Sequence, residues 1–201
     1  MDKKKLVQKI ILNKGGIAKT SDFALEGIKN YEVAALCKEG IIERIRRGFY
    51  QLPQNVVAGD EQIIKEMLPQ GIICVESALF HYGYSDFSPR KWSIAVPRTA
   101  SRTVKRVQEI PVKAYFIQKD FFNLGKTTDD FNGVLLEVYD RERTLCDCFK
   151  YRTKLDHEIF NKAVNAYAAD EQKNLANLSK YAKEMKLYTK VMNVMEVLLN
   201  G

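Results

Sequence analysis

The residues best equipped to bind another molecule are cations near the start of this sequence. Residues 1–55 carry eleven lysines and arginines against six acids, whereas residues 56–201 carry twenty-one against nineteen. Most of the formal net charge of +7 therefore lies in the first quarter of the chain. A basic segment that also folds is the electrostatic signature of a nucleic-acid-binding protein.

Ten residues of this segment are candidates for contact with double-stranded DNA. They are Lys19, Thr20, Ser21, Lys29, Asn30, Tyr31, Lys38, Arg44, Arg46 and Arg47. We expect the first three to touch phosphates, and Asn30, Tyr31 and Lys38 to read base edges in the major groove, with Lys29 at the start of the same helix. The three arginines are expected to act from a hairpin, where guanidinium groups can bind phosphates or enter a minor groove.

The sequence contains no signature of catalysis or of a cofactor. The Walker phosphate loop, the zinc-protease motif, the hydrolase nucleophile elbow and the dinucleotide fingerprint are all absent. The four cysteines, Cys37, Cys74, Cys146 and Cys148, and the two histidines have no zinc-site spacing. Each cysteine lies in an apolar context, which indicates small buried thiols in a reducing compartment. We expect neither enzymatic activity nor a bound metal.

One dense group of carboxylates is expected to be structural. Its members are Glu76, Glu137, Asp140, Glu142 and Asp147. Asp140 can cap the helix that follows it, and Arg143 can pair with Asp147 one turn later. His81 is expected to be a half-buried, hydrogen-bonded side chain.

The elements that must position the candidate DNA contacts form a predicted winged helix-turn-helix. Apolar spacing predicts helices over residues 2–13, 20–25 and 30–38, with Thr20 or Ser21 capping the second. Glycines fall where the helices end. Two short β-prone runs then flank Arg46-Arg47-Gly48, which predicts a hairpin turn. The order of three helices and an arginine-tipped hairpin is typical of this DNA-binding fold.

The rest of the chain predicts an α+β body that ends in a helical subdomain, so the fold class is α+β. Strands are expected at residues 72–75, 92–96, 112–117 and 134–139, and helices at 76–81, 140–151, 157–169, 171–186 and 188–199. The polar, proline- and glycine-containing stretch 51–60 is the predicted linker. The expected domains are 1–53 and 54–201. Two apolar stripes on the last helices are expected to be core: Leu175, Leu178, Tyr181, Ala182 and Met185, then Val191, Val194, Met195 and Leu198.

Six further cations lie within seventeen residues of the second region: Arg90, Lys91, Arg98, Arg102, Lys105 and Arg106. A solvated surface is the default interpretation of such a group. The alternative is a second patch that contacts phosphate or an acidic partner.

No apolar run is long enough to span a membrane. The basic start is interrupted by Gln8 and Lys9 and has no signal-peptide cleavage site. The protein is therefore expected in the cytoplasm, without a membrane partner.

Several motifs together resemble the AbiEi-type antitoxin family. The pattern L-x-x-x-G-x-I-x-R-x-x-R-G-x-Y-x-L runs from Leu36 to Leu52. The stretch ESALFHYGYSDFSPRKWSIAVPR resembles a second family motif, with Tyr84 where the family tends to have leucine. VLLEVYDRERTLCDCFKY resembles a third, through Glu142, Arg143, Thr144, Leu145 and Asp147.

The resemblance implies an autorepressor and antitoxin of a type IV toxin–antitoxin system linked to abortive infection by phage. Such proteins bind inverted repeats in their own promoter through the N-terminal domain, which allows for dimeric or cooperative binding. Their larger C-terminal domain counteracts a nucleotidyltransferase-like toxin. Alternatives are a direct toxin-binding inhibitor with secondary DNA binding, an enzyme that modifies the toxin or a nucleotide, and an RNA-binding protein. The last is disfavoured because aromatic stacking motifs of RNA modules are missing.

Overall fold

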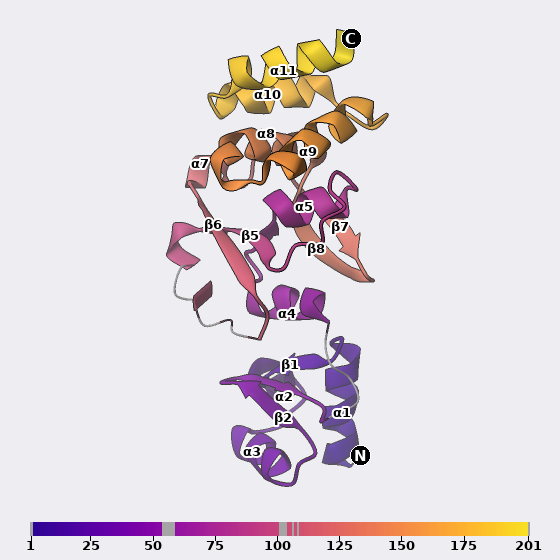
Figure 1. Cartoon of the computed structure of the whole chain (residues 1–201). Helices are drawn as coiled ribbons and strands as arrows, with labels where there is room; N and C mark the ends of the chain where they lie inside the picture. Colours follow the sequence, from indigo (N-terminus) through magenta and orange to yellow (C-terminus); the bar gives the residue numbers. More distant parts are fainter. Residues whose placement is uncertain (1, 54–58, 101–103, 106, 108, 201) are drawn as a thin grey trace. The chain divides into compact units, whose positions relative to one another are not determined.

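The computed structural model describes residues 2–53, 59–100, 104–105, 107 and 109–200. The chain divides into two compact units, Met1–Pro69 and Gln70–Gly201. The expected α+β class is confirmed, with helices and sheet in both units (Figure 1). Among the described residues, no helix combines the length and apolar composition needed to cross a bilayer.

The first unit contains three helices and a small sheet. Its elements are α1 (Lys3–Asn13), β1 (Ile17–Lys19), α2 (Thr20–Leu25), α3 (Asn30–Lys38), β2 (Glu43–Arg46) and β3 (Phe49–Gln51). The strands pair antiparallel in the order β1-β3-β2. Gly27, at φ +77°, makes the turn between α2 and α3, in a left-handed conformation that glycine adopts without a Cβ clash. The helix-turn-helix predicted over this segment is present.

Two local features of the first unit differ from expectation. The strand β1 was not predicted, because three residues are too few for a periodic pattern. The N-cap of α2 is Lys19 and not Thr20 or Ser21. The Asp22 carboxylate accepts the Lys19 backbone N–H at 2.7 Å and satisfies a free donor at the start of the helix.

The apolar faces of the three helices meet in one core. Its fully or almost fully buried members include Val7, Ile11, Phe23, Val33 and Ile42. The first four come from the inward faces of α1, α2 and α3, and Ile42 comes from the loop before β2. This core fixes α3 and the β2–β3 hairpin on one rigid support.

A further helix, α4 (Asp60–Met67), belongs to the first unit. The Gln62 side-chain amide donates to the Lys14 carbonyl at 2.7 Å. Glu66 pairs with Lys19 of β1 at 2.8 Å. The division of the chain consequently falls after Pro69, sixteen residues beyond the expected end of the first domain at Pro53. Residues 54–58 of the predicted linker lie outside the described residues.

The second unit is built on a mixed five-stranded sheet in the order β6-β5-β4-β8-β7. The strands are β4 (Ile72–Ile73), β5 (Trp92–Pro97), β6 (Val112–Ile117), β7 (Lys126–Phe131) and β8 (Val134–Tyr139). β6 and β8 have the predicted bounds, and β5 extends one residue further. β4 is shorter than predicted, because Val75 already begins a helix. β7 was missed, since its sequence KTTDDF is polar and its burial pattern is mostly exposed.

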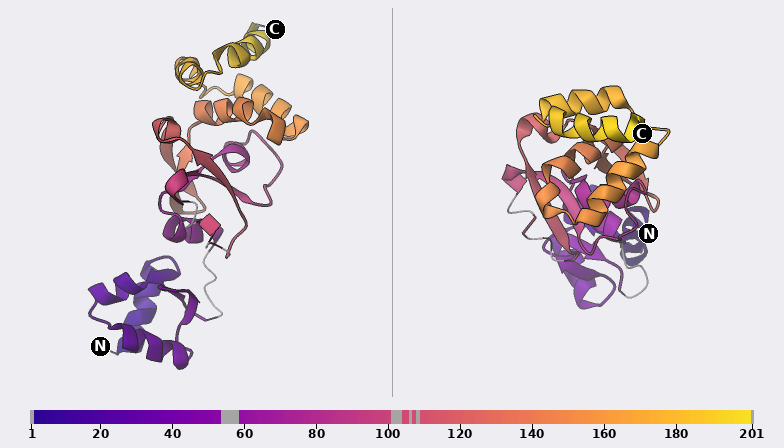
Figure 2. Two further views of the ribbon diagram at one scale, coloured as in Figure 1. Left: turned by 90° about the vertical axis from the view of Figure 1, so that its left-hand side faces the viewer. Right: turned by 45° about the horizontal axis from the view of Figure 1, so that its top comes forward.

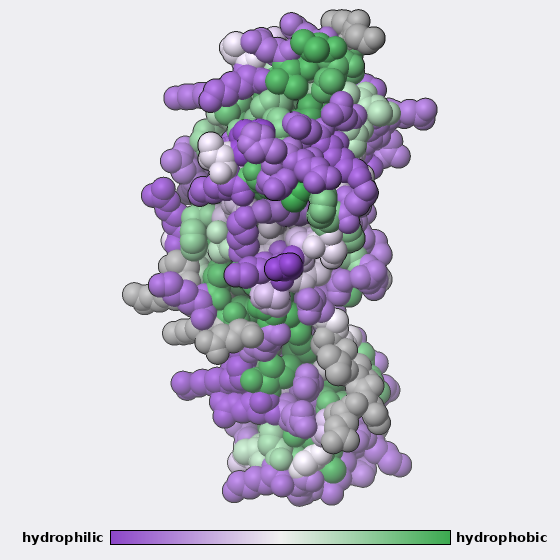
Figure 3. All heavy atoms as spheres, in the orientation of Figure 1, coloured by the Kyte–Doolittle hydropathy of each residue, from purple (hydrophilic) through white to green (hydrophobic). Residues whose placement is uncertain are grey.

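The helices of the second unit are α5 (Val75–His81), α7 (Lys119–Phe122), α8 (Arg141–Lys150), α9 (His157–Ala169), α10 (Leu175–Glu184) and α11 (Tyr188–Asn200). Helix α10 begins four residues later than predicted, and Asn174 caps it by accepting the Asn177 N–H at 3.0 Å. Helices α8 to α11 stack in successive layers beyond the sheet (Figure 2). The predicted apolar stripes do supply core residues, including Leu178, Val191 and Met195, but Leu175, also expected in the core, is 40% exposed. Other apolar side chains of α11 stay at the surface (Figure 3), and Val197 is 73% exposed.

All four cysteines are free thiols. Cys74, Cys146 and Cys148 are buried in the second unit, as expected, whereas Cys37 on α3 is only half-buried. Burial raises the pKa of the Cys146 thiol to about 12.

Candidate nucleic-acid interface

The β2–β3 hairpin carries the arginines of the predicted wing. Arg47 and Gly48 form its turn, and Gly48 has φ +85°, the left-handed conformation that a tight hairpin requires. The pairing shifts by one residue between Arg44 and Arg46. Arg44 and Arg47 are exposed, and Arg46 is half-buried. The hairpin thus presents cations at its tip, as predicted.

The wing turn lies directly against the start of α2. The Thr20 backbone N–H donates to the Gly48 carbonyl at 2.9 Å. On β3, the Phe49 ring lies 4.3 Å from the Arg46 guanidinium carbon and 5.8 Å from the Lys19 ammonium. Both cations are within the distance at which an aromatic face attracts them. Candidates from two separate sequence segments are therefore brought together.

Lys19 differs from the other candidates because its charge is already paired. Its ammonium lies 2.8 Å from the Glu66 carboxylate of α4, and both side chains are partly buried. A phosphate at this position would have to compete with Glu66. The structure thus places Lys19 beside the wing turn but leaves it the least available of the expected phosphate contacts.

The exposed face of α3 has the composition of a recognition helix. Asn30, Tyr31, Ala34 and Lys38 are exposed and share one face at helical spacing, and Tyr31 is 68% exposed. Val33 and Leu36 on the opposite side are buried. Small residues between polar ends allow a helix to approach the floor of a groove closely.

The acids of α3 are directed to α1 and paired there. Glu32 pairs with Lys3, and Glu39 pairs with Lys4 at 2.8 Å. Glu32 also accepts the Lys29 backbone N–H at 2.8 Å and so satisfies one donor at the helix start. These pairs neutralise Glu32 on α3 and Glu39 at its C-cap, whereas Lys29 at the N-cap and Lys38 take part in no described ion pair.

Two residues of this region were not singled out from the sequence. Phe49 looked like an ordinary strand residue, and only the fold reveals that two cations lie near its ring. Leu25, the last residue of α2, is 85% exposed. The sequence gives no signal that Leu25 is exposed, because α2 is too short for its apolar spacing to show which face is buried.

The second basic patch is only partly described. Arg90, Lys91, Arg98 and Lys105 are exposed, and none of them takes part in a described ion pair. Arg102 and Arg106 lie outside the described residues. The four described cations of the patch are therefore not neutralised by described salt bridges.

The carboxylates of the E-R-T-L stretch have the predicted structural roles. Asp140 caps α8 by accepting the Arg143 backbone N–H at 2.8 Å. The Arg143 Nε lies 3.3 Å from Asp147 Oδ1 in a pair with almost no solvent exposure. Glu142 accepts the Tyr167 hydroxyl at 3.1 Å and the Asn174 backbone N–H at 2.7 Å. These carboxylates hold helices together.

His81 is half-buried and hydrogen-bonded, as expected. Its Nε2 lies 2.9 Å from Asp129 Oδ2 on β7, and its ring stacks on Phe131 with 4.0 Å between centroids. Among the described residues, no group of three or more histidines, cysteines and acids is arranged to hold a metal.

Three helices, a strand and an arginine-tipped hairpin with these exposed faces define the winged helix-turn-helix class. The match to known families falls on the same segment. Residues 5–53 match the family described as "Transcriptional regulator, AbiEi antitoxin", which confirms the resemblance seen in the sequence. This match supports a role as an antitoxin and transcriptional regulator, and the matched family is not a family of enzymes.

The fold as a whole is similar to a solved protein. The crystal structure of the RV2827C protein from Mycobacterium tuberculosis aligns with a TM-score of 0.64 at 13% sequence identity, over 97% of this chain and 75% of that chain. At this identity the likeness shows the fold alone. Comparison with curated protein sequences found no match.

Proposed function

We propose that this protein is a DNA-binding transcriptional autorepressor. The observation that carries the proposal is the exposed cationic face of the first unit, on a segment that matches a transcriptional-regulator family. The acids of α3 are paired with α1, whereas Arg44, Arg47, Lys29 and Lys38 are exposed. A surface of this charge lowers its free energy by binding phosphates and releasing their counterions.

In the proposed complex, α3 lies in the major groove. Asn30 and Tyr31 at its start reach base edges, and Lys38 reaches the backbone at its far end. The wing, with Arg44, Arg46 and Arg47, contacts a phosphate or the adjacent minor groove. Thr20 and Ser21 contact phosphate beside the wing turn, and Lys19 joins them only where Glu66 releases it.

The family match supports a second part of the proposal. We infer that the protein is the antitoxin of a type IV toxin–antitoxin system in the cytoplasm, which binds inverted repeats in its own promoter as a dimer or cooperatively. The second unit then counteracts a nucleotidyltransferase-like toxin. Catalysis by this chain is not part of the proposal.

The DNA-binding proposal is tested with the full chain and a labelled duplex from its own upstream region. The double variant Arg46→Ala, Arg47→Ala is expected to bind operator and random duplexes more weakly to the same extent. The slope of log K against log salt concentration becomes shallower by about 0.9 for each phosphate that the variant no longer neutralises. The matched control is Lys180→Ala, an exposed cation on α10. Equal binding by the double variant and the parent protein excludes the wing from the interface.

The antitoxin part is tested by finding whether a nucleotidyltransferase-like protein is encoded next to this chain and by coexpressing the two. Rescue of growth by the parent chain is expected, also with the wing variant, since neutralisation is assigned to the second unit. Co-purification of the two chains distinguishes direct binding from an indirect mechanism. Failure to rescue growth would refute the antitoxin role and leave DNA binding to be judged by the titrations.

A further inference from the structure

Three cations from distant parts of the second unit line one cavity. The cavity has a volume of about 510 Å³. Arg98 comes from the turn after β5, Lys150 is the last residue of α8, and Lys186 lies between α10 and α11. The remaining lining residues are Phe116, Gln118, Asp120, Phe121, Tyr151 and Met185. Cations that line one cavity repel one another, and an anion bound between them offsets that repulsion.

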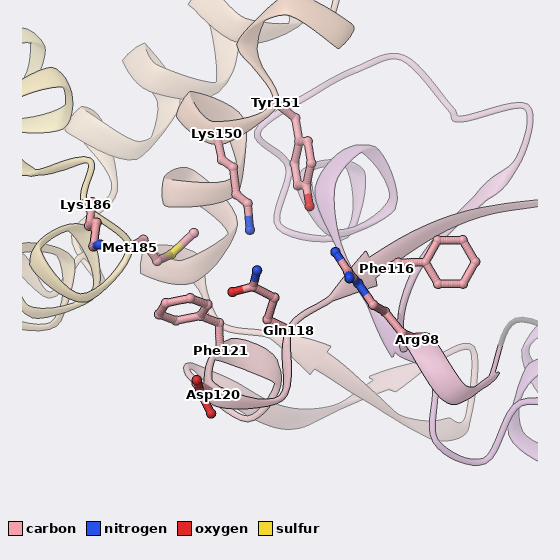
Figure 4. Close-up of a pocket in the computed structure, with 9 residues that line it drawn as sticks. All are labelled: Arg98, Phe116, Gln118, Asp120, Phe121, Lys150, Tyr151, Met185 and Lys186. Carbon is pink, nitrogen blue, oxygen red and sulfur yellow. The ribbon is translucent and has the colours of Figure 1, made fainter.

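The polar groups converge inside the cavity. Figure 4 shows the Lys150 ammonium and the Gln118 amide directed toward each other, and the Arg98 guanidinium directed toward the Tyr151 hydroxyl. Lys150 lies between Arg98 and Lys186 in this view. The Asp120 carboxylate points away from this group, so the cavity presents positive charge and neutral hydrogen-bonding groups.

No described acid neutralises these cations. Arg98, Lys150 and Lys186 take part in no ion pair among residues 59–100, 104–105, 107 and 109–200. Burial lowers the pKa of the Lys150 ammonium and outweighs the attraction of the Asp147 carboxylate, so holding this charge in the cavity is costly. An anionic ligand in the cavity would lower that cost, because all three cations line it.

The size and the walls of the cavity point to a small organic molecule. A volume of about 510 Å³ lies within the range of roughly 300–1,000 Å³ typical of small-molecule sites. Phe121 and Met185 supply apolar surface beside the cations. Several converging cations with an amide and a hydroxyl suit the tetrahedral oxygens of phosphate better than a single carboxylate, which one guanidinium can already satisfy.

We propose that this cavity binds a small phosphorylated organic molecule. Its phosphate lies at Lys150, with Arg98 and Lys186 on either side, and its organic part packs on Phe121 and Met185. This site is independent of the DNA-binding surface of the first unit. A ligand bound in this cavity could change how the second unit counteracts the toxin, which rests on the proposed function.

The test is calorimetric titration of the full chain with inorganic pyrophosphate, adenosine 5′-monophosphate and adenosine. Saturable binding of the two phosphates, and none of adenosine, is expected. Lys150→Gln should weaken the affinity for pyrophosphate at least tenfold, whereas Lys180→Gln, an exposed cation outside the cavity, should leave it unchanged. Equal loss in both variants would show diffuse attraction to a basic protein and overturn the proposal, as would the absence of saturable binding.

Lys186→Gly separates binding from folding. Lys186 has φ +58°, a left-handed conformation that glycine adopts without strain, so this variant is expected to melt no earlier than the parent protein. Its affinity for pyrophosphate should nevertheless fall. Unchanged affinity for pyrophosphate in a folded Lys186→Gly variant would exclude Lys186 from the site. In a competition experiment, displacement of pyrophosphate by duplex DNA would overturn the proposal and assign the cavity to DNA binding.

Discussion

At the scale of single residues, Tyr31 is a large aromatic side chain that is 68% exposed on the proposed reading face. Its ring is fixed to a helix whose opposite side is buried through Val33 and Leu36, so it can present its hydroxyl to a base edge with little loss of freedom. Its neighbour Glu32 caps the helix by accepting the backbone N–H of Lys29, and the Lys29 ammonium takes part in no described ion pair. Base recognition and phosphate binding are thus assigned to different residues of the same helix.

Replacing Tyr31 by alanine tests this assignment. The free-energy difference between operator and random-duplex binding is expected to fall by about 1–3 kcal/mol for each base that Tyr31 reads. Affinity for random duplex should change little, because phosphate contacts are retained. Anisotropy titrations with both duplexes measure the two values. Parallel losses on both duplexes would indicate a contact to the backbone instead.

Arg143 is a buried cation of the second unit that contacts several elements. Its side chain has no exposed surface, and Nη1 donates to the carbonyls of Phe121 at 2.7 Å and Leu124 at 2.8 Å. The guanidinium also lies 4.1 Å from the Tyr139 ring centre. One buried cation therefore joins the loop around α7, the end of β8 and α8.

Arg143→Met is expected to destabilise the protein by about 3–5 kcal/mol, because it leaves the Asp147 carboxylate buried without its partner. The double variant Arg143→Met, Asp147→Leu removes both charges and should recover part of the loss. Urea unfolding measures each free energy. A single variant as stable as the parent would show that the pair contributes little.

At the scale of elements, Glu76 connects α5 to two strands of the sheet. Its carboxylate accepts hydrogen bonds from Ser93 on β5 and Tyr115 on β6, both at 2.8 Å, and pairs with Lys113. Burial raises the Glu76 pKa, but the hydrogen bonds from Lys113, Ser93 and Tyr115 outweigh it and hold the pKa below its ordinary value of 4.5. The charged form is favoured by the fold.

A depressed pKa contributes stability that is complete above pH 4.5 and is lost as the pH falls through the folded-state pKa. We therefore expect the second unit to lose stability below this pH. Glu76→Gln should be less stable at pH 7 and should flatten the pH dependence in this acidic range. Urea unfolding at several pH values decides the outcome. An unchanged slope in the variant would assign the acid sensitivity to other carboxylates.

Elements with a strong apolar period were predictable from the sequence. Helices 20–25, 30–38 and 157–169 and strands 112–117 and 134–139 have the predicted bounds. β1 and β7 were missed, because pairing with a neighbouring strand and not their own pattern makes them strands. Proximity between sequence-distant groups, such as Phe49 with Lys19 or the three cations of the cavity, depends on tertiary packing and cannot be read from spacing.

At the scale of the whole molecule, the limits of the first unit depend on α4. The helix follows the stretch expected to be a linker, yet Gln62 and Glu66 bind Lys14 and Lys19 of the first unit. Its sequence DEQIIKEM has only three apolar residues. A hydrophobic pattern this weak did not predict a helix, and the domain boundary was placed too early relative to the observed contacts.

A fragment of residues 1–69 is expected to be more stable than a fragment of residues 1–53 by about 1–2 kcal/mol, from one hydrogen bond and one partly exposed ion pair. Thermal unfolding followed by circular dichroism measures the difference. Gln62→Ala within the longer fragment should remove part of the gain. Fragments of equal stability would show that α4 does not support the fold of the first unit.

The rates at which the thiols are alkylated depend on how far each of them is buried. Alkylating reagents attack thiolates, and Cys74 and Cys148 are buried groups whose pKa values are raised by desolvation, so they react only when the surrounding structure opens. Cys37 lies half-buried on the proposed recognition helix. Mass-resolved alkylation kinetics can therefore follow the opening of the second unit at Cys74 and Cys148, and the accessibility of α3 at Cys37, in the same unmodified chain.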